Sequence, residues 1–249
     1  MNRVVCLLLV SFFTSICSAQ IVDPELLKLL ERHAETLRSE IHPNGLKSLI
    51  LEGVHEKKDG TLVPVELKKE HPGKIRLETQ QSNNLKVTIG YNAQLGVSWG
   101  RIDDGKRVAL IDPSEKQNIN WLAIDSDFDG HLIRALKGDE SVNLTRLNSY
   151  PVPNSALKLH CILATDDSDH EFRYYLHPTK FYMLRKQVIP GDGSAVMEVR
   201  HSHYRPVEGI PIAHRISLYE DGVHKSTENY SNVRVNEEIY DFLFEKSPY

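Results

Sequence analysis

The sequence has 249 residues and a formal net charge of -4, from 30 Lys and Arg against 34 Asp and Glu. Hydrophobic residues make up 40% and charged residues 26%, an ordinary globular composition that excludes the disordered and fibrous classes. No segment concentrates basic residues, whereas a nucleic-acid-binding surface needs a positive stripe along the phosphates. We therefore expect no nucleic-acid partner.

The first 19 residues read MNRVVCLLLVSFFTSICSA. Arg3 precedes an apolar run over residues 4–13, and small residues follow up to Ala19, which is the pattern of a secretory signal peptide. The alternative is a membrane anchor, but the run is shorter than the ~20 residues that span a bilayer. We predict a signal peptide over residues 1–19 and a single domain over residues 20–249, exported and not membrane-spanning.

Cleavage after Ala19 would remove two of the three cysteines and leave only Cys161, so no internal disulfide can form. A chain of about 230 residues buries roughly 70% of its surface and can be stable on its core alone. Cys161 alternates with Leu159 and Leu163 on one face of a predicted strand, which favours a buried thiol over a catalytic nucleophile. The nucleophile remains the alternative.

A helix is predicted over residues 23–39. Asp23 is a good N-cap and Pro24 suits the first helical position. Apolar positions then recur at three- and four-residue spacing, which predicts one buried stripe. They are Leu26, Leu29, Leu30, His33, Ala34 and Leu37.

From Leu46 onward the hydrophobic period changes to two. Strands are predicted over residues 62–68, 74–79, 85–91 and 95–99, separated by short Gly-, Pro- and Asn-containing turns. Strands this close in sequence form an antiparallel meander. Each has one apolar and one charged face, so we expect the sheet to be covered on one side only.

The alternation lapses over residues 113–140, where a short helix carrying Trp121 and a helical turn near residues 132–136 are predicted. It returns in seven further strands. They are predicted over residues 143–147, 157–164, 171–176, 181–188, 196–204, 210–219 and 227–235. The fold class is α+β, mainly β: a single curved antiparallel sheet, an incomplete β-barrel, with a few helices covering its concave apolar face.

Two motifs suggest metal ligands. Residues 125–130 (DSDFDG) match the start of a calcium loop, but its twelfth position is Leu136 instead of the bidentate Glu, so an acidic turn is the better interpretation. His201 and His203 are predicted on one strand face, but no third ligand is fixed by the sequence, and two ligands leave zinc incomplete. We expect no metal site and no cofactor.

Catalytic motifs are missing from the sequence. There is no G-x-S-x-G elbow, no P-loop and no dinucleotide fingerprint. The paired carboxylates lie in turns and at strand edges, where solvent leaves their pKa values untuned. We predict that the protein is not an enzyme; a hydrolase whose triad residues are scattered along the chain is the alternative.

The layout and four local strings resemble the LolA-like family, which includes the outer-membrane lipoprotein-sorting proteins. The strings are DFDGHL at 127–132, YYLHPT at 174–179, YRPVEGIP at 204–211 and VNEEIYDFLF at 235–244. The resemblance implies an incomplete antiparallel barrel wrapped round helices, with an apolar cavity that receives acyl chains. It implies periplasmic carriers or ligand-sensing domains, not enzymes. No motif identifies which Arg would be the family's lid-closing arginine.

Two functions follow as hypotheses. The first is a periplasmic, non-enzymatic carrier that holds an acyl chain, a lipoprotein or another apolar ligand in the hollow of the curved sheet. The alternative is an envelope protein-interaction or stress-sensing module of the same fold, with envelope proteins as partners. A carrier should leave an apolar cavity open, whereas an interaction module should fill it and expose a patch.

The alternating pattern also predicts which apolar side chains line the hollow, with Trp121 from the covering helix and the others from strands. For each one, the alternative is a plain packed core position. The predicted lining residues are Val63, Val65, Ile75, Leu77, Val87, Val97, Trp99 and Trp121.

Overall fold

The computed structural model describes residues 23–38, 45–81, 85–111, 126, 128, 130–153, 155–168 and 170–245. Three sequence predictions lie outside these residues in whole or in part. They are the signal peptide over residues 1–19, the helix carrying Trp121, and much of the acidic turn at 125–130.

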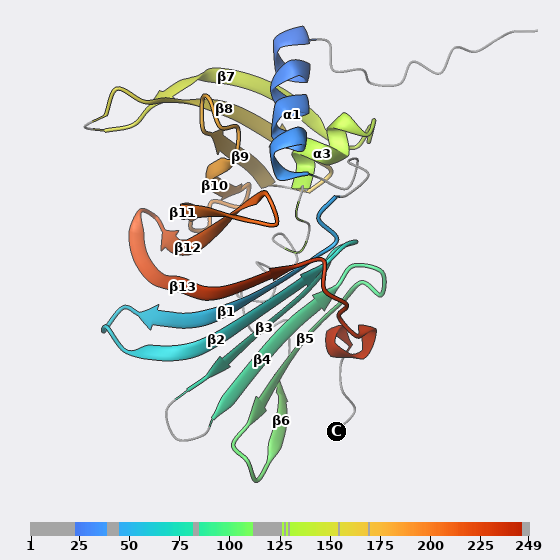
Figure 1. Cartoon of the computed structure of the whole chain (residues 1–249), viewed down its shortest axis with the longest axis vertical. Helices are drawn as coiled ribbons and strands as arrows, with labels where there is room; N and C mark the ends of the chain where they lie inside the picture. The colour runs from blue at the N-terminus through green and yellow to red at the C-terminus, as the bar shows by residue number, and fades with distance from the viewer. Residues whose placement is uncertain are drawn as a thin grey trace, which may run out of the picture.

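The described strands form one 13-stranded sheet that is antiparallel throughout (Figure 1). This confirms the predicted fold class, a mainly β protein built on one curved, unclosed sheet. The first half of the sheet contains β1 (Ser48–Lys57), β2 (Leu62–Glu70), β3 (Lys74–Gln80), β4 (Lys86–Asn92), β5 (Val97–Asp103) and β6 (Val108–Ile111). The second half contains β7 (Asn143–Pro151), β8 (Lys158–Thr165), β9 (His170–Leu176), β10 (Met183–Pro190), β11 (Met197–Val207), β12 (Ile210–Glu220) and β13 (Val223–Val235).

The strand order is β6-β5-β4-β3-β2-β1-β13-β12-β11-β10-β9-β8-β7. Each half is a simple meander, and the pairing of β1 with β13 joins the two halves. The register shifts at Gly53 of β1, where an added Cβ would lie 2.0 Å from the carbonyl oxygen of Asn229, so only glycine fits this close approach. The two edge strands, β6 and β7, do not pair with each other, and the sheet stays open.

The described helical elements are α1 (Pro24–Leu37), α3 (Gly130–Leu136) and the 3₁₀ helix η3 (Asp241–Phe244). As predicted, Asp23 caps α1: its side chain accepts a hydrogen bond from the backbone N–H of Glu25 at 2.9 Å. The helix ends at Arg38, which has a left-handed φ of 44° and donates its backbone N–H to carbonyls of the last turn. The end lies close to the predicted one.

We call the face of the sheet that carries α1 and α3 the inner face. Two clusters of buried side chains lie on it, and both draw on strands that are far apart in sequence. Below the helices the cluster consists of Leu26, Leu29, Leu30, Leu132, Ile162, Ala164, Phe172, Tyr174, Leu176 and Val188. The second cluster lies around the β1–β13 junction and consists of Leu46, Leu49, Leu51, Val65, Leu67, Ile75, Ile210, Ile212, Tyr230 and Val235.

The opposite, outer face is also partly covered, so the expectation of cover on one side only is wrong. After β13 the chain folds back and η3 lies beside the first half of the sheet (Figure 1). There Phe244 of η3 packs with Ile50 on the outer face. A further outer cluster joins Leu159, Cys161 and Tyr175. Cys161 is unpaired and buried, as predicted, and burial raises the pKa of its thiol. A protonated, covered thiol is a poor nucleophile.

Candidate functional site

A cleft of about 120 Å³ lies between the inner face and the helices; we call it the inner cleft. Its floor is apolar and comes from β1, β2 and β12. The floor residues are Leu49, Leu51, Leu67, Ile212 and Ile216. Its other end is polar and is lined from α1 and from β9 to β11. The residues of this polar end are His33, Tyr174, Lys186, His201 and Tyr204.

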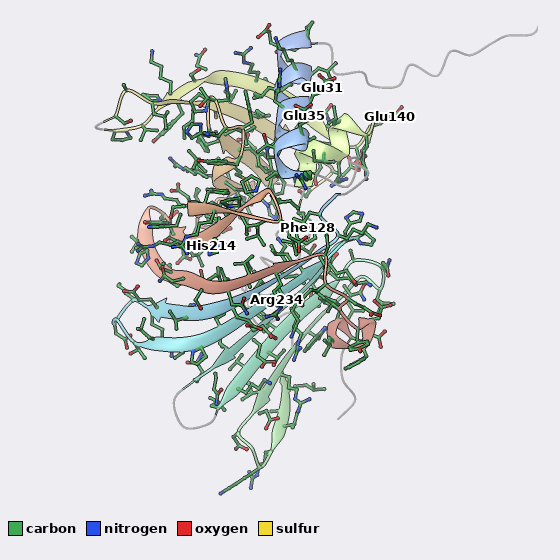
Figure 2. The ribbon with its side chains drawn as sticks, in the orientation of Figure 1. Glu31, Glu35, Phe128, Glu140, His214 and Arg234 are labelled. Atoms are coloured by element: carbon green, nitrogen blue, oxygen red, sulfur yellow. The ribbon has the colours of Figure 1, made fainter. Side chains whose placement is uncertain are left out.

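Phe128 stands between the helical half of the molecule and the β1–β5 half (Figure 2), and it lines the inner cleft. Its ring packs against the core around the β1–β13 junction. The buried ammonium group of Lys69 lies 5.3 Å from the centre of this ring, and that of Lys186 lies 5.8 Å from the Tyr174 ring. Both distances are typical of cation–π contacts, which stabilise a charge that has lost water.

His33 belongs to the buried stripe of α1, and its Nδ1 lies 2.7 Å from the carbonyl oxygen of Phe181. A carbonyl oxygen only accepts, so Nδ1 carries the proton and donates it. Burial lowers the pKa of His33 to about 4, which the Phe181 hydrogen bond only partly opposes. The ring is therefore neutral at pH 7, with an unprotonated Nε2.

A chain of hydrogen bonds runs from the β8–β9 turn to Tyr174. The Nε2 of His131 lies 2.9 Å from a carboxylate oxygen of Asp166, and its Nδ1 lies 2.7 Å from the Tyr174 hydroxyl. Burial works to raise the pKa of Asp166, but hydrogen bonds from Ser168 and His131 outweigh it and lower the pKa to about 2. Burial lowers the pKa of His131. An ionised Asp166 beside a neutral His131 requires that Nε2–H donates to Asp166, so Nδ1 accepts the proton of the Tyr174 hydroxyl.

The hydroxyl of Tyr204 donates a hydrogen bond to the carbonyl oxygen of Met183. Its ring stacks on Tyr182 with centroids 4.0 Å apart and an interplanar angle of 17°. Burial, and then the nearby Tyr182, raise the pKa of Tyr204. The hydroxyl is therefore neutral, and its position is fixed by both contacts.

Five of the predicted lining residues lie on the inner face. Val63, Val65 and Ile75 are buried, and Leu77 and Val87 are partly buried. The described lining of the inner cleft comes instead from neighbours such as Leu67, which is Leu77's partner across β2 and β3. That these five side chains contact a ligand stays a prediction.

Val97 and Trp99 were predicted on this same face, and their placement is wrong. Trp99 pairs with Gly90, which alternates with the inward-pointing Ile89 and Tyr91, so Trp99 points outward. The 93–96 turn sets this register by pairing Asn92 with Val97, and Val97 is 39% exposed. A shift of one residue moves every side chain of a strand to the other face. Trp121 lies outside the described residues.

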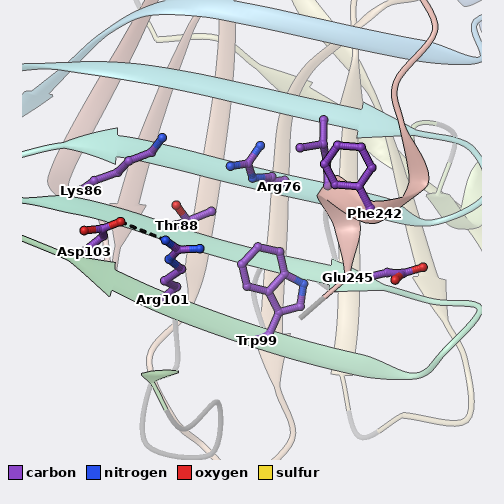
Figure 3. A pocket seen from close by; sticks show the side chains of 9 residues that line it. Arg76, Lys86, Thr88, Trp99, Arg101, Asp103, Phe242 and Glu245 are labelled. Atoms are coloured by element: carbon purple, nitrogen blue, oxygen red, sulfur yellow. Dashed lines mark hydrogen bonds and ion pairs between the residues drawn. The ribbon is translucent and has the colours of Figure 1, made fainter. Parts of the chain in front are cut away.

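Trp99 instead helps to form a separate hollow of about 200 Å³ on the outer face, which we call the outer pocket (Figure 3). The Trp99 ring lies against Gly90, where an added Cβ would be 2.6 Å from it, and its Nε1 donates to the carbonyl oxygen of Phe244 at 3.1 Å. The pocket is lined by Arg76, Lys86, Thr88, Trp99, Arg101, Asp103, Phe242, Leu243 and Glu245.

The charged groups around the outer pocket form ion pairs within their own face. Arg101 forms an ion pair with Asp103, marked by the dashed line in Figure 3, at 2.9 Å. Arg76 lies 2.6 Å from Glu78. Lys86 lies 2.5 Å from the other oxygen of Glu78. These pairs are partly exposed, and such pairs contribute little to stability.

The polar end of the inner cleft was not predicted. A histidine on the apolar stripe of α1 and the tyrosine-rich string at 174–179 were visible signals. Sequence spacing does not show that α1, β9 and β11 converge, because this convergence depends on pairings between distant strands.

Within the described ranges, no group of three or more His, Cys, Asp or Glu side chains could hold a metal ion. His201 is half-buried, whereas His203, with a left-handed φ of 54°, is exposed, so the two do not present a paired set of ligands. No helix in the described part of the chain is both long and apolar enough to cross a bilayer.

The architecture defines the class of fold: an open, curved antiparallel sheet that holds helices against its inner face is the LolA-like fold. No protein-family model and no curated protein matches the sequence. Solved structures do match, with identities of 10–14% that show the fold alone.

One similar structure is a domain from Vibrio parahaemolyticus named for outer membrane lipoprotein sorting: 14% identity, TM-score 0.57, covering 88% of this chain and 95% of that one. A second is a LolA superfamily protein from Nitrosomonas europaea, with 10% identity, TM-score 0.57 and coverage of 88% and 96%. A third is a DUF1329 family protein from Desulfovibrio piger, with 12% identity, TM-score 0.58 and coverage of 89% and 96%.

Proposed function

We propose that the protein is an exported, periplasmic binding protein without enzymatic activity, and that its inner cleft holds the acyl chain of a lipid or lipoprotein, or another apolar ligand. The observation that carries this proposal is the apolar floor beneath a helical cover, in a LolA-like fold. The lipoprotein-sorting name of one similar structure is consistent with this class of cargo.

Burial of hydrocarbon supplies the affinity in this proposal. Each methylene transferred from water contributes about 0.8 kcal/mol before ordering costs. The inner cleft has a volume of about 120 Å³, close to the about 150 Å³ of an apolar cavity that admits benzene. It therefore accepts the end of an acyl chain as it stands.

Leu67→Phe tests this function by adding a bulky ring to the floor of the inner cleft. We expect at least about tenfold weaker binding of a fluorescent acyl probe, because the ring occupies the space that the chain would fill. Val87→Phe is the matched control: Val87 shares the inner face but is not among the described lining of the cleft. Circular dichroism would confirm that both variants fold.

Wild-type protein that binds none of a series of probes from eight to eighteen carbons would contradict the proposal. Equal binding by wild type and a folded Leu67→Phe variant would place the ligand elsewhere. If Val87→Phe alone weakened binding, the predicted lining by Val63, Val65, Ile75, Leu77 and Val87 would be the better account.

Export is tested separately by intact mass. Cleavage after Ala19 would leave a mature chain that begins at Gln20. Protein isolated from the periplasm with its first 19 residues still attached would contradict the signal-peptide prediction.

The second candidate, an envelope protein-interaction module, is favoured by one specific observation. Tyr240 and Phe242 are 62% and 65% exposed, and their rings stack with centroids 5.7 Å apart. Aromatic side chains are enriched at protein interfaces. A photo-crosslinking residue at position 242 that captured no envelope protein in the periplasm would contradict this role.

A further inference from the structure

Three of the polar side chains that line the inner cleft, His33, Tyr174 and Tyr204, share one property: each donates its proton to an acceptor within the protein. Nδ1–H of His33 is donated to the carbonyl oxygen of Phe181, at 2.7 Å. The hydroxyl of Tyr204 is donated to the carbonyl oxygen of Met183. Both acceptors lie in the same short segment, 181–183, so the two groups are held at one end of the cleft.

The segment that supplies these carbonyls has an unusual backbone. Phe181 has a left-handed φ of 60°, an uncommon conformation for a bulky side chain. Its carbonyl accepts the His33 hydrogen bond, and the ring of the next residue, Tyr182, stacks on Tyr204. The segment thus fixes His33 and Tyr204 together.

Tyr174 reaches the same result by another route. Asp166 accepts the Nε2–H of His131, so Nδ1 of His131 accepts the hydroxyl proton of Tyr174 at 2.7 Å. That hydroxyl lies 3.1 Å from the position of a Cβ added to Gly130, and Gly130 and Tyr174 both line the cleft. The oxygen of Tyr174 is therefore at the wall of the cleft.

A hydroxyl or ring N–H that already donates its hydrogen bond within the protein can only accept a hydrogen bond from a ligand. A hydroxyl oxygen has two lone pairs, and the unprotonated Nε2 of a neutral histidine has one. His33, Tyr174 and Tyr204 thus act as acceptors toward anything that enters the polar end of the cleft. Donors on a ligand are favoured there, and further acceptors lose their hydrogen bonds to water without replacement.

We propose that the inner cleft selects a neutral amphiphile whose head group carries O–H or N–H donors, such as a glycerol monoester, and that His33, Tyr174 and Tyr204 accept its hydrogen bonds. This inference rests on the proposed function, because it takes the apolar tail to lie on the cleft floor.

A fatty-acid anion is the rival ligand, because the ammonium groups of Lys69 and Lys186 attract a carboxylate whereas the three acceptors oppose it. A carboxylate offers only acceptors and would face three more. The ammonium groups of Lys69 and Lys186 already make contacts within the protein, including those with the rings of Phe128 and Tyr174.

The test compares two probes of identical chain length: 1-O-hexadecylglycerol, which has two hydroxyl donors, and its 2,3-di-O-methyl ether, which has none. Each competes for the wild-type protein against a fluorescent acyl probe. We expect the diol to bind at least about fivefold more tightly than the ether, as the gain of one or two net hydrogen bonds implies. Palmitate at pH 7.5 should bind more weakly than the diol.

Tyr174→Phe and Tyr204→Phe should each reduce the ratio of diol affinity to ether affinity to less than about half of the wild-type ratio. The affinity for the ether should change little. Tyr175→Phe is the matched control, because Tyr175 is adjacent in sequence but packs in the outer cluster, where its hydroxyl donates to Gln187. Its preference for the diol should equal that of wild type.

Three outcomes would overturn the inference. Equal binding of the diol and the ether by wild type would contradict the proposed hydrogen bonds to the head group, but not the proposed carrier function. Tighter binding of palmitate than of the diol would assign the cleft to anions. If neither probe nor any fluorescent acyl probe bound, the proposed function and this inference would fail together.

Discussion

The inner cleft and the outer pocket lie on opposite faces of one sheet, and both combine aromatic rings with basic side chains. They differ in how their polar groups are satisfied. The outer pocket is surrounded by ion pairs such as Arg101–Asp103, which are open to water. The inner cleft holds neutral groups with fixed protons, and its charges are buried against rings. Binding specificity is therefore expected in the inner cleft, and structural packing dominates the outer pocket.

The largest effect is expected for Trp99→Ala, which tests whether the outer pocket is structural. Trp99 is 5% exposed, packs on Gly90 and donates to the carbonyl oxygen of Phe244, so its removal should lower the free energy of unfolding by about 3–5 kcal/mol. Urea denaturation measures this loss. Acyl-probe affinity of the folded fraction should be unchanged, with Trp99→Phe as a milder control.

A folded Trp99→Ala protein that no longer binds acyl probes would reverse the comparison. It would mean that the outer pocket is the ligand site, although Trp99 points away from the inner cleft.

The next largest effect concerns pH and the buried His33. Its pKa is about 4 in the folded protein against 6.5 in the unfolded chain, so the unfolded state binds the extra proton first as the pH falls. The neutral ring therefore contributes stability above pH 6.5 that is progressively lost toward pH 4, amounting to about 3 kcal/mol. His33→Leu should remove that part of the pH dependence.

Urea denaturation of wild type and His33→Leu at pH 7 and pH 4 measures this difference. Parallel losses of stability in the two proteins would show that His33 is not the titrating group. Asp166 and His131, whose pKa values are also lowered in the folded protein, are present in both proteins, so their contributions cancel in the comparison.

The smallest effect is expected for Arg101→Ala in the outer pocket. The Arg101–Asp103 pair is partly exposed, with side chains 29% and 28% accessible, so its loss should change the free energy of unfolding by less than about 1 kcal/mol. Thermal denaturation at low and high salt measures this change. A loss of several kcal/mol would show that the outer pocket depends on its charges as much as on Trp99.

The local parts of the fold were predictable from sequence. The cap at Asp23, the apolar stripe of α1 and the alternation along β2 and β3 each follow from residues within a few positions of one another. Which face of the sheet each side chain of β5 occupies was not predictable. The 93–96 turn decides whether Trp99 points inward, and alternation alone fits either face.

For the candidate site, the sequence predicted an apolar sheet face but not the position of the cleft or its polar end. Five of the eight residues predicted to line the hollow lie on the inner face, but the cleft within it is formed where β1, β12 and α1 meet. That meeting depends on the pairing of β1 with β13, for which spacing along the chain gives no signal. The proton positions at Tyr174 likewise depend on His131 and Asp166, which come from separate elements.

The strand order also has a consequence for the sequence of events in folding. Every described strand pair except one joins neighbours along the chain, and the exception pairs Leu49 of β1 with Val235 of β13. Such a long-range pairing forms slowly because the intervening chain must first be ordered. During synthesis β1 can pair with β2 at once, but its other edge stays bare until almost the whole chain has been made. The junction that builds the floor of the cleft is therefore the last part of the sheet that can close.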